Sequence, residues 1–341
     1  MDCSIIVPCR NEARHIDDFL KSVQKQEFGD YTWEVLIADG ASSDGTAERL
    51  REFAAAHPEF RIVSNPQKVV STGLNLAIRE ARGKYIIRLD VHAVYAPDYC
   101  RTCIDTLVRT RATNVGGPAR TIARGRLAMA IAAAYHSSFS TGGAKFHDEQ
   151  FEGWVDTVPF GCWERETLVA AGLFDETLVR NQDDELNLRL VRAGGKIWQT
   201  PEIRCWYSTR DSLGKLFHQY FQYGFWKVAV IRKHRLPASW RHLVPVTFVA
   251  ANALCAAALL LRAPLALPVW LGLLTGYFAV LLFASAITAR GSGGTGAAYL
   301  PAVFATFHIS YGLGFLAGAK WLFVKPPQPS GAESVFSRLS R

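Results

Sequence analysis

The sequence predicts a doubly wound, Rossmann-like α/β domain followed by an interfacial amphipathic helix and by C-terminal transmembrane helices. Strand and helix patterns alternate over roughly the first 120 residues in units of about 20 to 30 residues, which is typical of parallel strands joined by crossover helices. Of the 30 acidic residues, all but one precede Ser212, and none lies between Ser212 and Ala332. This asymmetry indicates a soluble half and a membrane half, and it excludes a single uniform globule.

The first half of the predicted domain contains four short apolar strands and the helices between them. Each strand is a brief apolar run, and each helix has apolar residues at helical spacing. The expected strands are 3–8, 33–38, 60–64 and 85–89, and the expected helices are 13–26, one beginning near Ala47, and 72–81. Asp44 or Thr46 is expected to cap the second helix.

The pattern is less regular beyond residue 124. An alanine-rich helical stretch leads into Ser-Thr-Gly-Gly-Ala, which we expect to form a mobile loop. The remaining elements expected in the domain are a strand at 154–160, helices at 166–171 and 183–193, and a strand at 196–199. Glycines that follow each helix indicate where the helices end.

The second half begins with an aromatic helix and continues with three apolar segments. Residues 212–234 interleave aromatic side chains with Lys and Gln, which indicates a helix lying on the bilayer; the alternative is a core helix of the soluble domain. Segments 243–261, 263–289 and about 300–322 follow, and 19 helical residues reach about 28 Å, enough to span a bilayer. His308 and three glycines dilute the last segment, so two spans plus a re-entrant or peripheral helix form an alternative.

Charge and cysteine usage orient the predicted membrane protein. Basic residues gather before the first apolar segment, namely Lys215, Lys227, Arg232, Lys233, Arg235 and Arg241. Such cations are typical of a cytoplasmic face in contact with anionic lipid. The seven scattered cysteines fit a reducing compartment. Because a strand-like run follows Met1 directly, we expect no signal peptide. We therefore expect a multi-pass protein of the cytoplasmic (inner) membrane. Nucleic acid is excluded as a partner, because no groove-reading motif accompanies the net charge of +8.

The expected domains follow from these signals. They are an α/β domain at 1–210, an amphipathic helix and basic juxtamembrane segment at 211–242, a membrane domain with two to three transmembrane helices at 243–323, and a polar tail at 324–341. The N-terminal domain is expected to face the cytoplasm.

Acids at the carboxyl ends of strands mark a candidate site, because ligands of doubly wound sheets bind there. Asp39 and Asp90 end the second and fourth predicted strands. In the sequence Arg88-Leu-Asp90-Val-His92, Asp90 and His92 can turn toward one cation, and an Asp–His pair suits Mn²⁺ at least as well as Mg²⁺. Such a metal would bridge a diphosphate. The alternative is that Asp90 caps the next turn, with His92 hydrogen-bonded nearby.

A second acidic signal opens the helix expected at 183–193. Asp183, Asp184 and Glu185 are adjacent, and acids at a helix N-terminus are stabilised by the helix dipole, so one interpretation is a charged first turn. The other is a general base, since neighbouring like charges raise one another's pKa. Arg189 lies one to two turns further on and could hold one carboxylate in place.

Taken together, these motifs resemble those of a known enzyme family. The segments that carry the resemblance are Ser4-Ile-Ile-Val-Pro-Cys-Arg-Asn-Glu12, Ala38-Asp-Gly-Ala-Ser-Ser-Asp-Gly-Thr46, Gly73-Leu-Asn-Leu-Ala77, Asp90-Val-His92 and Gln182-Asp183-Asp-Glu-Leu. In this order and spacing, over about residues 3 to 235, they resemble the inverting glycosyltransferases of family 2, which have the GT-A fold with a doubly wound mixed sheet. Asp-x-His-Ala, Phe160-Gly-Cys-Trp-Glu and the segment 219–226 are most similar to the membrane-associated glucosyltransferases of succinoglycan-type exopolysaccharide synthesis.

The resemblance implies a role for each matching residue. Those implied to contact the nucleotide are Pro8, Arg10, Glu12, Asp39, Asp44 and Lys68, with Asp39 accepting from the uracil N3–H. Asp90 and His92 would hold a divalent metal, Mn²⁺ or Mg²⁺, on the diphosphate, and Asp183 would deprotonate the acceptor hydroxyl. The residues implied to support the base or the acceptor are Asp184, Glu185, Arg189, Gln219 and Trp226.

Three departures from the family pattern stand out. His92 replaces the usual second acid of the metal motif, which leaves the metal preference open. Gln182 replaces the usual acid before the base, so Asp184 or Glu185 is the candidate to compensate. The segment 219–226 lacks the Arg of the Q-x-x-R-W motif of processive synthases, which weakens the case for processivity.

The resemblance implies transfer of a hexose from a UDP-sugar, UDP-glucose first among them, to a polyprenyl-diphosphate-linked saccharide, with inversion at the anomeric carbon. The implied setting is exopolysaccharide or cell-surface glycan synthesis. A processive polysaccharide synthase and a non-catalytic, nucleotide-binding membrane scaffold are the alternatives. A nicotinamide dehydrogenase is excluded, because no G-x-G-x-x-G follows the first strand.

Overall fold

The computed structural model describes residues 1–237 and 239–323, which form two compact units. The sheet unit comprises Met1–Thr121 and Lys145–Ser208, and the helical unit comprises Ile122–Ala144 and the described residues from Thr209 onward. The expected boundary after residue 210 lies close to this division, but the sequence did not indicate that 122–144 would join the second unit. The predicted polar tail at 324–341 lies outside the described residues.

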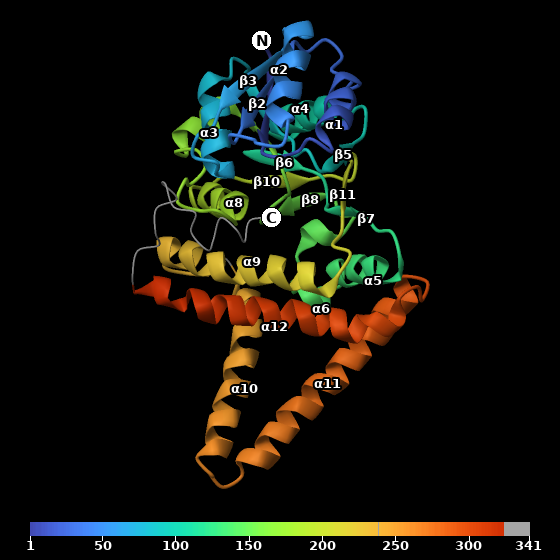
Figure 1. The fold of residues 1–341 in the computed structure, drawn as a ribbon, viewed down its shortest axis with the longest axis vertical. Coiled ribbons are helices and arrows are strands. Elements are labelled where there is room, and N and C mark those ends of the chain that lie inside the picture. The colour runs from blue at the N-terminus through green and yellow to red at the C-terminus, as the bar shows by residue number, and fades with distance from the viewer. Residues whose placement is uncertain (238, 324–341) are drawn as a thin grey trace. The chain divides into compact units, whose positions relative to one another are not determined.

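An eight-stranded mixed sheet forms the centre of the sheet unit, with the strand order β3-β2-β1-β4-β9-β6-β10-β8 (Figure 1). The four predicted strands are present as β1 (Cys3–Cys9), β2 (Trp33–Asp39), β3 (Phe60–Ser64) and β4 (Tyr85–Arg88), and all pair in parallel. The helices between and after them are α1 (Ile16–Gln24), α2 (Thr46–Ala56), α3 (Val70–Glu80) and α4 (Tyr99–Thr110). The first half of the domain therefore has the predicted order of strands and helices.

The second half of the sheet unit is built from shorter strands and contains antiparallel pairs. Its strands are β5 (Ala93–Tyr95), β6 (Asn114–Gly116), β7 (Arg120–Ile122), β8 (Gly153–Val155), β9 (Cys162–Glu164), β10 (Ile197–Gln199) and β11 (Cys205–Ser208). Strand β9 is antiparallel to both β4 and β6, and β5, β11 and β7 form a separate three-stranded sheet. The strand predicted at 154–160 is wrong beyond Val155, where the chain turns before β9. Helices α7 (Arg165–Ala170) and α8 (Gln182–Arg192) match the remaining predicted helices.

Alternation along the parallel strands divides the core into two layers. Ile5, Val7, Val35 and Ile37 pack on one side of the sheet with α1 and α4, whereas Ile6, Leu36, Ala38 and Ile86 pack on the other with α3 and α8. Both faces are thus covered by helices, as a doubly wound sheet requires. Cys100 and Cys103 on α4 are fully buried because they face this core.

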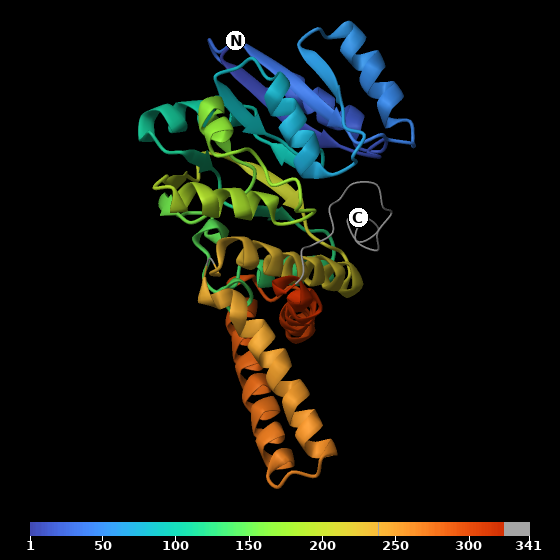
Figure 2. The same cartoon turned by 90° about the vertical axis from the view of Figure 1, so that its left-hand side faces the viewer.

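The helical unit contains α5 (Arg126–Tyr135), α6 (Ser138–Thr141), α9 (Leu213–His234), α10 (Val244–Leu260), α11 (Ala266–Gly291) and α12 (Leu300–Gly318). The loop expected after the alanine-rich stretch is in part α6. Among the described residues, three helical segments are long and apolar enough to cross a membrane, namely Trp240–Leu260, Ala266–Gly291 and Ala297–Gly318. Helices α10 and α11 form a hairpin, and α12 runs across the direction of that hairpin (Figures 1 and 2).

The third apolar segment differs from the other two in how much of it is covered. None of the most apolar stretch of Trp240–Leu260 is buried within the protein, whereas 44% of the corresponding stretch of Ala297–Gly318 is. Most of this cover comes from α9. For example, the ring of Tyr220 on α9 lies 4.3 Å from the ring of Phe307 on α12. This arrangement fits the alternative of two spans plus a peripheral helix, and the interfacial placement of α9 stays a prediction.

Glycines allow α9 and α12 to approach each other at backbone distance. A Cβ atom added to Gly314 would lie 2.0 Å from the carbonyl oxygen of Phe221, and one added to Gly224 would lie 2.1 Å from that of Tyr311. Both distances are far below van der Waals contact, so any larger residue must push the helices apart. The close contact between α9 and α12 therefore requires glycine, which has no side chain, at both positions.

We expect Gly314→Ala to destabilise the helical unit by about 1–3 kcal/mol, the usual cost of overpacking. Gly276→Ala on α11 is the matched control, because a Cβ there meets nothing within 4 Å and alanine favours a helix. Thermal unfolding of the detergent-purified protein measures both. Equal melting temperatures for the two variants would contradict the close packing of α9 on α12.

Candidate active site

Hydrogen bonds join the loops that follow β1 and β2, at the carboxyl ends of these strands. The backbone N–H of Glu12 donates to Oγ1 of Thr46 at 2.7 Å, and the N–H of Ala13 donates to the Asp44 carboxylate at 3.1 Å. Asn11, at a positive φ, donates through its N–H to Oγ of Ser42 at 2.8 Å. Glu12 and Asp44, both predicted to contact the nucleotide, therefore lie on two loops that hold each other in place.

Asp44 shapes this junction rather than capping a helix. Its carboxylate accepts from Oγ1 of Thr46 at 2.6 Å, and α2 is preceded by Gly45 at a positive φ. The expected cap by Asp44 or Thr46 is thus wrong, because Gly45 takes the cap position and Thr46 is already helical. Burial raises the pKa of Asp44, but the hydrogen bonds from Thr46 and Ala13 outweigh it and hold that pKa below its ordinary value.

Asp39 ends β2 opposite Cys9, and the next residues after the two strands, Gly40 and Arg10, lie close together. The Asp39 carboxylate at the end of β2 accepts from Oγ of Ser42 at 2.6 Å. Gly40 lies so close to Arg10 that an added Cβ would meet the arginine Cβ at 3.1 Å. Nε of Arg10 is buried and has no hydrogen-bond partner within 1–237 and 239–323. Pro8 pairs with Ala38 one residue before this point. A buried donor without a partner suits a polar ligand such as a nucleobase.

Lys68 lies apart from that cluster. It is exposed in the β3–α3 loop at a φ of 61°, and its N–H donates to the carbonyl of Asn65. In the described part of the chain, no hydrogen bond joins its side chain to the other predicted nucleotide residues.

The structure brings together one predicted nucleotide residue and one predicted metal ligand. Nε2 of His92 lies 2.9 Å from Oε1 of Glu12, and the rings of His92 and His15 are 5.0 Å apart, edge to face. The Glu12 side chain is 16% exposed and that of His92 is 61% exposed. The first loop and the end of β4 are therefore directly linked.

Arg88 connects the predicted metal ligand Asp90 to the predicted base Asp183. Its Nε and Nη2 donate to the two carboxylate oxygens of Asp90 at 3.2 and 3.1 Å, and its Nη1 lies 4.0 Å from Oδ2 of Asp183. Burial lowers the pKa of Arg88, but the two carboxylates raise it more, so that pKa lies above its ordinary value. Tyr95 accepts from the Asp90 N–H at 2.7 Å and fixes the backbone there.

Among the three adjacent acids of α8, the side chains of Asp183 and Glu185 lie in different environments. Asp183 is the second residue of the helix and its side chain is 40% exposed, and it accepts from the N–H of Asp184 at 2.9 Å. Glu185 is fully buried and accepts from Nε and Nη2 of Arg189 at 3.1 and 2.8 Å. Arg189 therefore holds Glu185, and it also donates to the carbonyls of Ala171 and Leu173.

A buried amide network fixes the middle of α8 against the sheet. The side-chain amide of Asn114 on β6 donates to Asn187 at 2.8 Å, and Asn187 donates to Oγ1 of Thr157 at 2.8 Å. Both asparagines are almost fully buried. Sequence reasoning missed these residues and the role of Arg88, because only the fold brings Asn114 to Asn187 and Arg88 to Asp183.

We expect Arg189→Ala to destabilise the sheet unit by about 3–5 kcal/mol, because it leaves the buried Glu185 carboxylate without its counter-charge. Arg192→Ala, at an exposed position of the same helix, is the matched control and should change stability by less than about 0.5 kcal/mol. Urea unfolding followed by tryptophan fluorescence measures both. Equal unfolding midpoints for the two variants would show that the Glu185–Arg189 pair does not stabilise the fold.

The donor set at the end of β4 fits a metal that is held largely by its substrate. Among the described residues, no group of three or more His, Cys, Asp or Glu side chains is placed to hold a metal ion. The Asp90 carboxylate is one-third exposed, and its oxygens retain lone pairs beside the bonds from Arg88. Mg²⁺ in phosphate-binding sites commonly takes one or two protein carboxylates plus phosphate oxygens. Asp90, with His92 next to it, meets that requirement.

The two remaining candidates lie on α9, in the helical unit. Gln219 accepts from Nε of Arg210 at 3.1 Å and donates to the Tyr223 hydroxyl at 3.0 Å. Trp226 is 4% exposed, so its ring is part of the packing of that unit.

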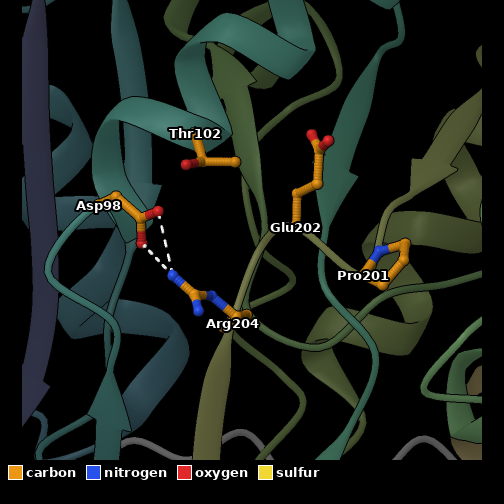
Figure 3. A pocket seen from close by; sticks show the side chains of 5 residues that line it. All are labelled: Asp98, Thr102, Pro201, Glu202 and Arg204. Atoms are coloured by element: carbon orange, nitrogen blue, oxygen red, sulfur yellow. Dashed lines mark hydrogen bonds and ion pairs between the residues drawn. The ribbon is translucent and has the colours of Figure 1, made fainter.

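One surface hollow of about 500 Å³ lies away from these residues. It is lined by Asp98, Thr102, Pro201, Glu202 and Arg204, and the Arg204 guanidinium donates to both oxygens of Asp98 at 3.1 Å (Figure 3). None of these side chains belongs to the candidate site. The site at the carboxyl ends of β1, β2 and β4 is therefore defined by its residues and not by this hollow.

Comparison with known proteins agrees with the geometry. The family described as Glycosyl transferase family 2 matches residues 4–162. The chain is also 33% identical over 244 residues to the succinoglycan biosynthesis protein ExoA of Rhizobium meliloti (strain 1021), which covers 71% of this chain and 74% of that protein. The chain belongs to glycosyl transferase family 2. The family predicted from its motifs is confirmed.

Other relatives of this glycosyltransferase extend the likeness. A Methanococcus voltae protein is 29% identical over 254 residues, 72% of this chain and 78% of its own; it is named dolichyl N-acetyl-alpha-D-glucosaminyl phosphate 3-beta-D-2,3-diacetamido-2,3-dideoxy-beta-D-glucuronosyltransferase. Among solved structures, the mannosyltransferase PcManGT from Pyrobaculum calidifontis, in complex with GDP-Man and Mn²⁺, matches with a TM-score of 0.59 and 21% identity, over 94% of this chain and 88% of that one. The predicted GT-A fold is confirmed.

Proposed function

We propose that this glycosyltransferase moves a hexose from a UDP-sugar, UDP-glucose first among them, to a hydroxyl of a polyprenyl-diphosphate-linked saccharide. The observation that carries the proposal is the pair of carboxylates, Asp90 and Asp183, on either side of the buried Arg88. Leaving-group stabilisation and deprotonation of the acceptor need two such groups close together. The name of the Rhizobium relative supports exopolysaccharide or cell-surface glycan synthesis as the setting.

Binding of the nucleoside is assigned to the joined loops after β1 and β2. The residues proposed for it are Pro8, Arg10, Glu12, Asp39, Asp44 and Lys68. Ser42 donates through Oγ to Oδ1 of Asp39 at 2.6 Å and through its N–H to Oδ2 at 3.3 Å, and the second lone pair of Oδ2 is proposed to accept from the N3–H of uracil. Nε of Arg10 has an unused donor for a carbonyl of the same base. Asp44 contributes by holding the loop after β2 in place through its hydrogen bonds with Ala13 and Thr46.

Deprotonation of the acceptor is assigned to Asp183. Its carboxylate is accessible, stands at the N-terminal end of α8, and accepts a proton from the acceptor hydroxyl as that oxygen attacks the anomeric carbon. The attack comes from the face opposite the nucleotide, so the configuration inverts in one displacement. Asp184 supports the base from the same turn, while Glu185 and Arg189 keep the helix in place. Positioning of the two substrates supplies much of the rate.

Asp90 and His92 are proposed to hold Mn²⁺ or Mg²⁺. When bound, such a cation neutralises charge on the departing UDP. The solved mannosyltransferase contains Mn²⁺ together with its nucleotide sugar, which supports a divalent metal here. Glu12 keeps His92 at the edge of this position through the 2.9 Å contact.

The lipid-linked acceptor is proposed from the helical unit. Three segments long and apolar enough to cross a membrane, together with the dolichyl phosphate in the name of the Methanococcus relative, support an acceptor carried by lipid. Gln219 and Trp226 on α9 are assigned to the acceptor side. We place the protein in the cytoplasmic membrane as a multi-pass protein, with the catalytic domain (1–210) facing the cytoplasm and joined by 211–242 to the membrane domain.

Nucleotide release from the detergent-purified protein tests the proposal. UDP-glucose, UDP-galactose, their N-acetyl forms and GDP-mannose are supplied with Mn²⁺, with and without a polyprenyl-diphosphate-linked saccharide. We expect acceptor-dependent release of UDP from one UDP-sugar. Release from GDP-mannose alone would replace the donor assignment, and binding of UDP without turnover of any donor would favour a non-catalytic scaffold.

A further inference from the structure

Arg88 has one hydrogen-bond donor that the structure leaves unused. The residue ends β4 and is 5% exposed, and two of its three guanidinium nitrogens are taken by Asp90. The third, Nη1, is buried and has no hydrogen-bond partner among the residues that the structure describes. A buried N–H without an acceptor is costly, so such an atom in a native protein calls for an explanation.

The nearest carboxylate to that donor is the proposed base. Oδ2 of Asp183 lies 4.0 Å from Nη1, about 1 Å beyond the usual N–H to O hydrogen-bond distance. Asp183 is partly exposed and lies in the first turn of α8, so its side chain can change rotamer without disturbing the core. The guanidinium, in contrast, is held by two bonds in a plane. A small movement of the Asp183 carboxylate toward Arg88 would allow Nη1 to donate a hydrogen bond to Oδ2, so that all three guanidinium nitrogens would have an acceptor.

We infer that Arg88 is a positioning residue: held by Asp90 through two nitrogens, it uses its third nitrogen to orient the Asp183 carboxylate toward the acceptor. This inference rests on the proposed function, in which Asp183 is the base. It assigns Asp90 a second task, that of fixing the guanidinium. It also explains why an arginine is needed, because lysine has no rigid, planar set of donors that can hold two carboxylates at once.

A double-mutant cycle on the full-length protein tests the inference. Initial rates of UDP release are measured for the unaltered protein, Arg88→Lys, Asp183→Asn and the double variant, each over a range of UDP-sugar concentrations at saturating acceptor. We expect Arg88→Lys to lower kcat by about 100-fold and to change the KM for the UDP-sugar less than about threefold, because positioning of a general base accounts for rate effects of that order. In the Asp183→Asn background, the same change should lower the remaining rate less than about threefold.

Arg61 supplies a matched control. It also joins two carboxylates, those of Glu34 and Glu80, each at 3.1 Å, and it lies on β3 away from the candidate base. Arg61→Lys should leave kcat within about twofold of the original. An equal loss of kcat in both arginine variants would overturn the inference, since it would reflect a general effect of weakening a bridged ion pair.

Two further readouts separate positioning from folding. Melting temperature and calorimetric UDP affinity are measured for Arg88→Lys and for the neutral Arg88→Gln; UDP affinity retained within about threefold in either variant, with kcat lost, supports the inference. Loss of UDP binding and of the folded state in both would make Arg88 a structural residue and overturn it. An additive cycle would overturn the inference alone, whereas a wild-type rate for Asp183→Asn would remove the base and, with it, the proposed mechanism.

Discussion

Replacement of Asp183 by Asn is expected to lower acceptor-dependent UDP release by about 100- to 10,000-fold, the range that a general base contributes. The amide has the shape of the carboxylate but cannot accept the proton of the acceptor hydroxyl. UDP affinity should stay within about threefold, because Asp183 lies on α8 and not on the loops assigned to the nucleoside. Initial rates and calorimetric titration with UDP measure the two quantities separately.

Glu166→Gln is the matched control for this variant. Glu166 is an exposed acid in the first turn of α7, so its replacement removes one charge from a helix N-terminus in the same unit. Its rate should stay within about twofold. If Asp183→Asn turns over at a rate comparable to this control, another group takes the proton and the assignment of the base is wrong.

Replacement of Asp90 by Asn is expected to lower turnover by at least about 100-fold and to abolish stimulation by Mn²⁺. The variant loses a charged oxygen that could bind the cation, and the remaining amide accepts only one of the two bonds from Arg88. EDTA should inactivate the unaltered protein, and added Mn²⁺ should restore it. Rates across a Mn²⁺ titration measure both effects.

Asp98→Asn serves as the control, because Asp98 also binds an arginine, Arg204, with both carboxylate oxygens at 3.1 Å and is not a candidate site residue. Its Mn²⁺ response should equal that of the unaltered protein. Turnover that is indifferent to EDTA, or an Asp90→Asn variant with a normal Mn²⁺ response, would contradict the assignment of a metal to the end of β4.

The sequence predicts the first half of the fold well and the second half less completely. Strands β1, β2 and β4 are buried on both faces, so each appears as a continuous apolar run that is easy to locate. The strands near Asn114, Cys162 and Cys205 have three or four residues each, too few for a periodic signal to identify. Their antiparallel pairings also depend on partners far away in the chain.

The candidate site shows the same division. Asp39, Asp90 and Asp183 could be named from the sequence because strand ends and helix starts are local features. The roles of Arg88 and Asn187 could not, because they depend on partners far away in the chain. Arg88 lies about 95 positions from Asp183. Asn187 lies 30 positions from Thr157 and 73 from Asn114. The acidic triplet looked uniform in sequence, but helical geometry directs Glu185 into the core and leaves Asp183 accessible.

The anomeric configuration of the product tests the central claim most directly. The proposed mechanism is a single displacement. An acceptor oxygen deprotonated by Asp183 attacks the anomeric carbon from the face opposite the nucleotide. Proton NMR of the glycosylated acceptor reports the configuration through the coupling between the first two sugar protons. With an α-linked UDP-glucose donor, we predict a β-linked product. An α-linked product would contradict the single displacement and the role given to Asp183.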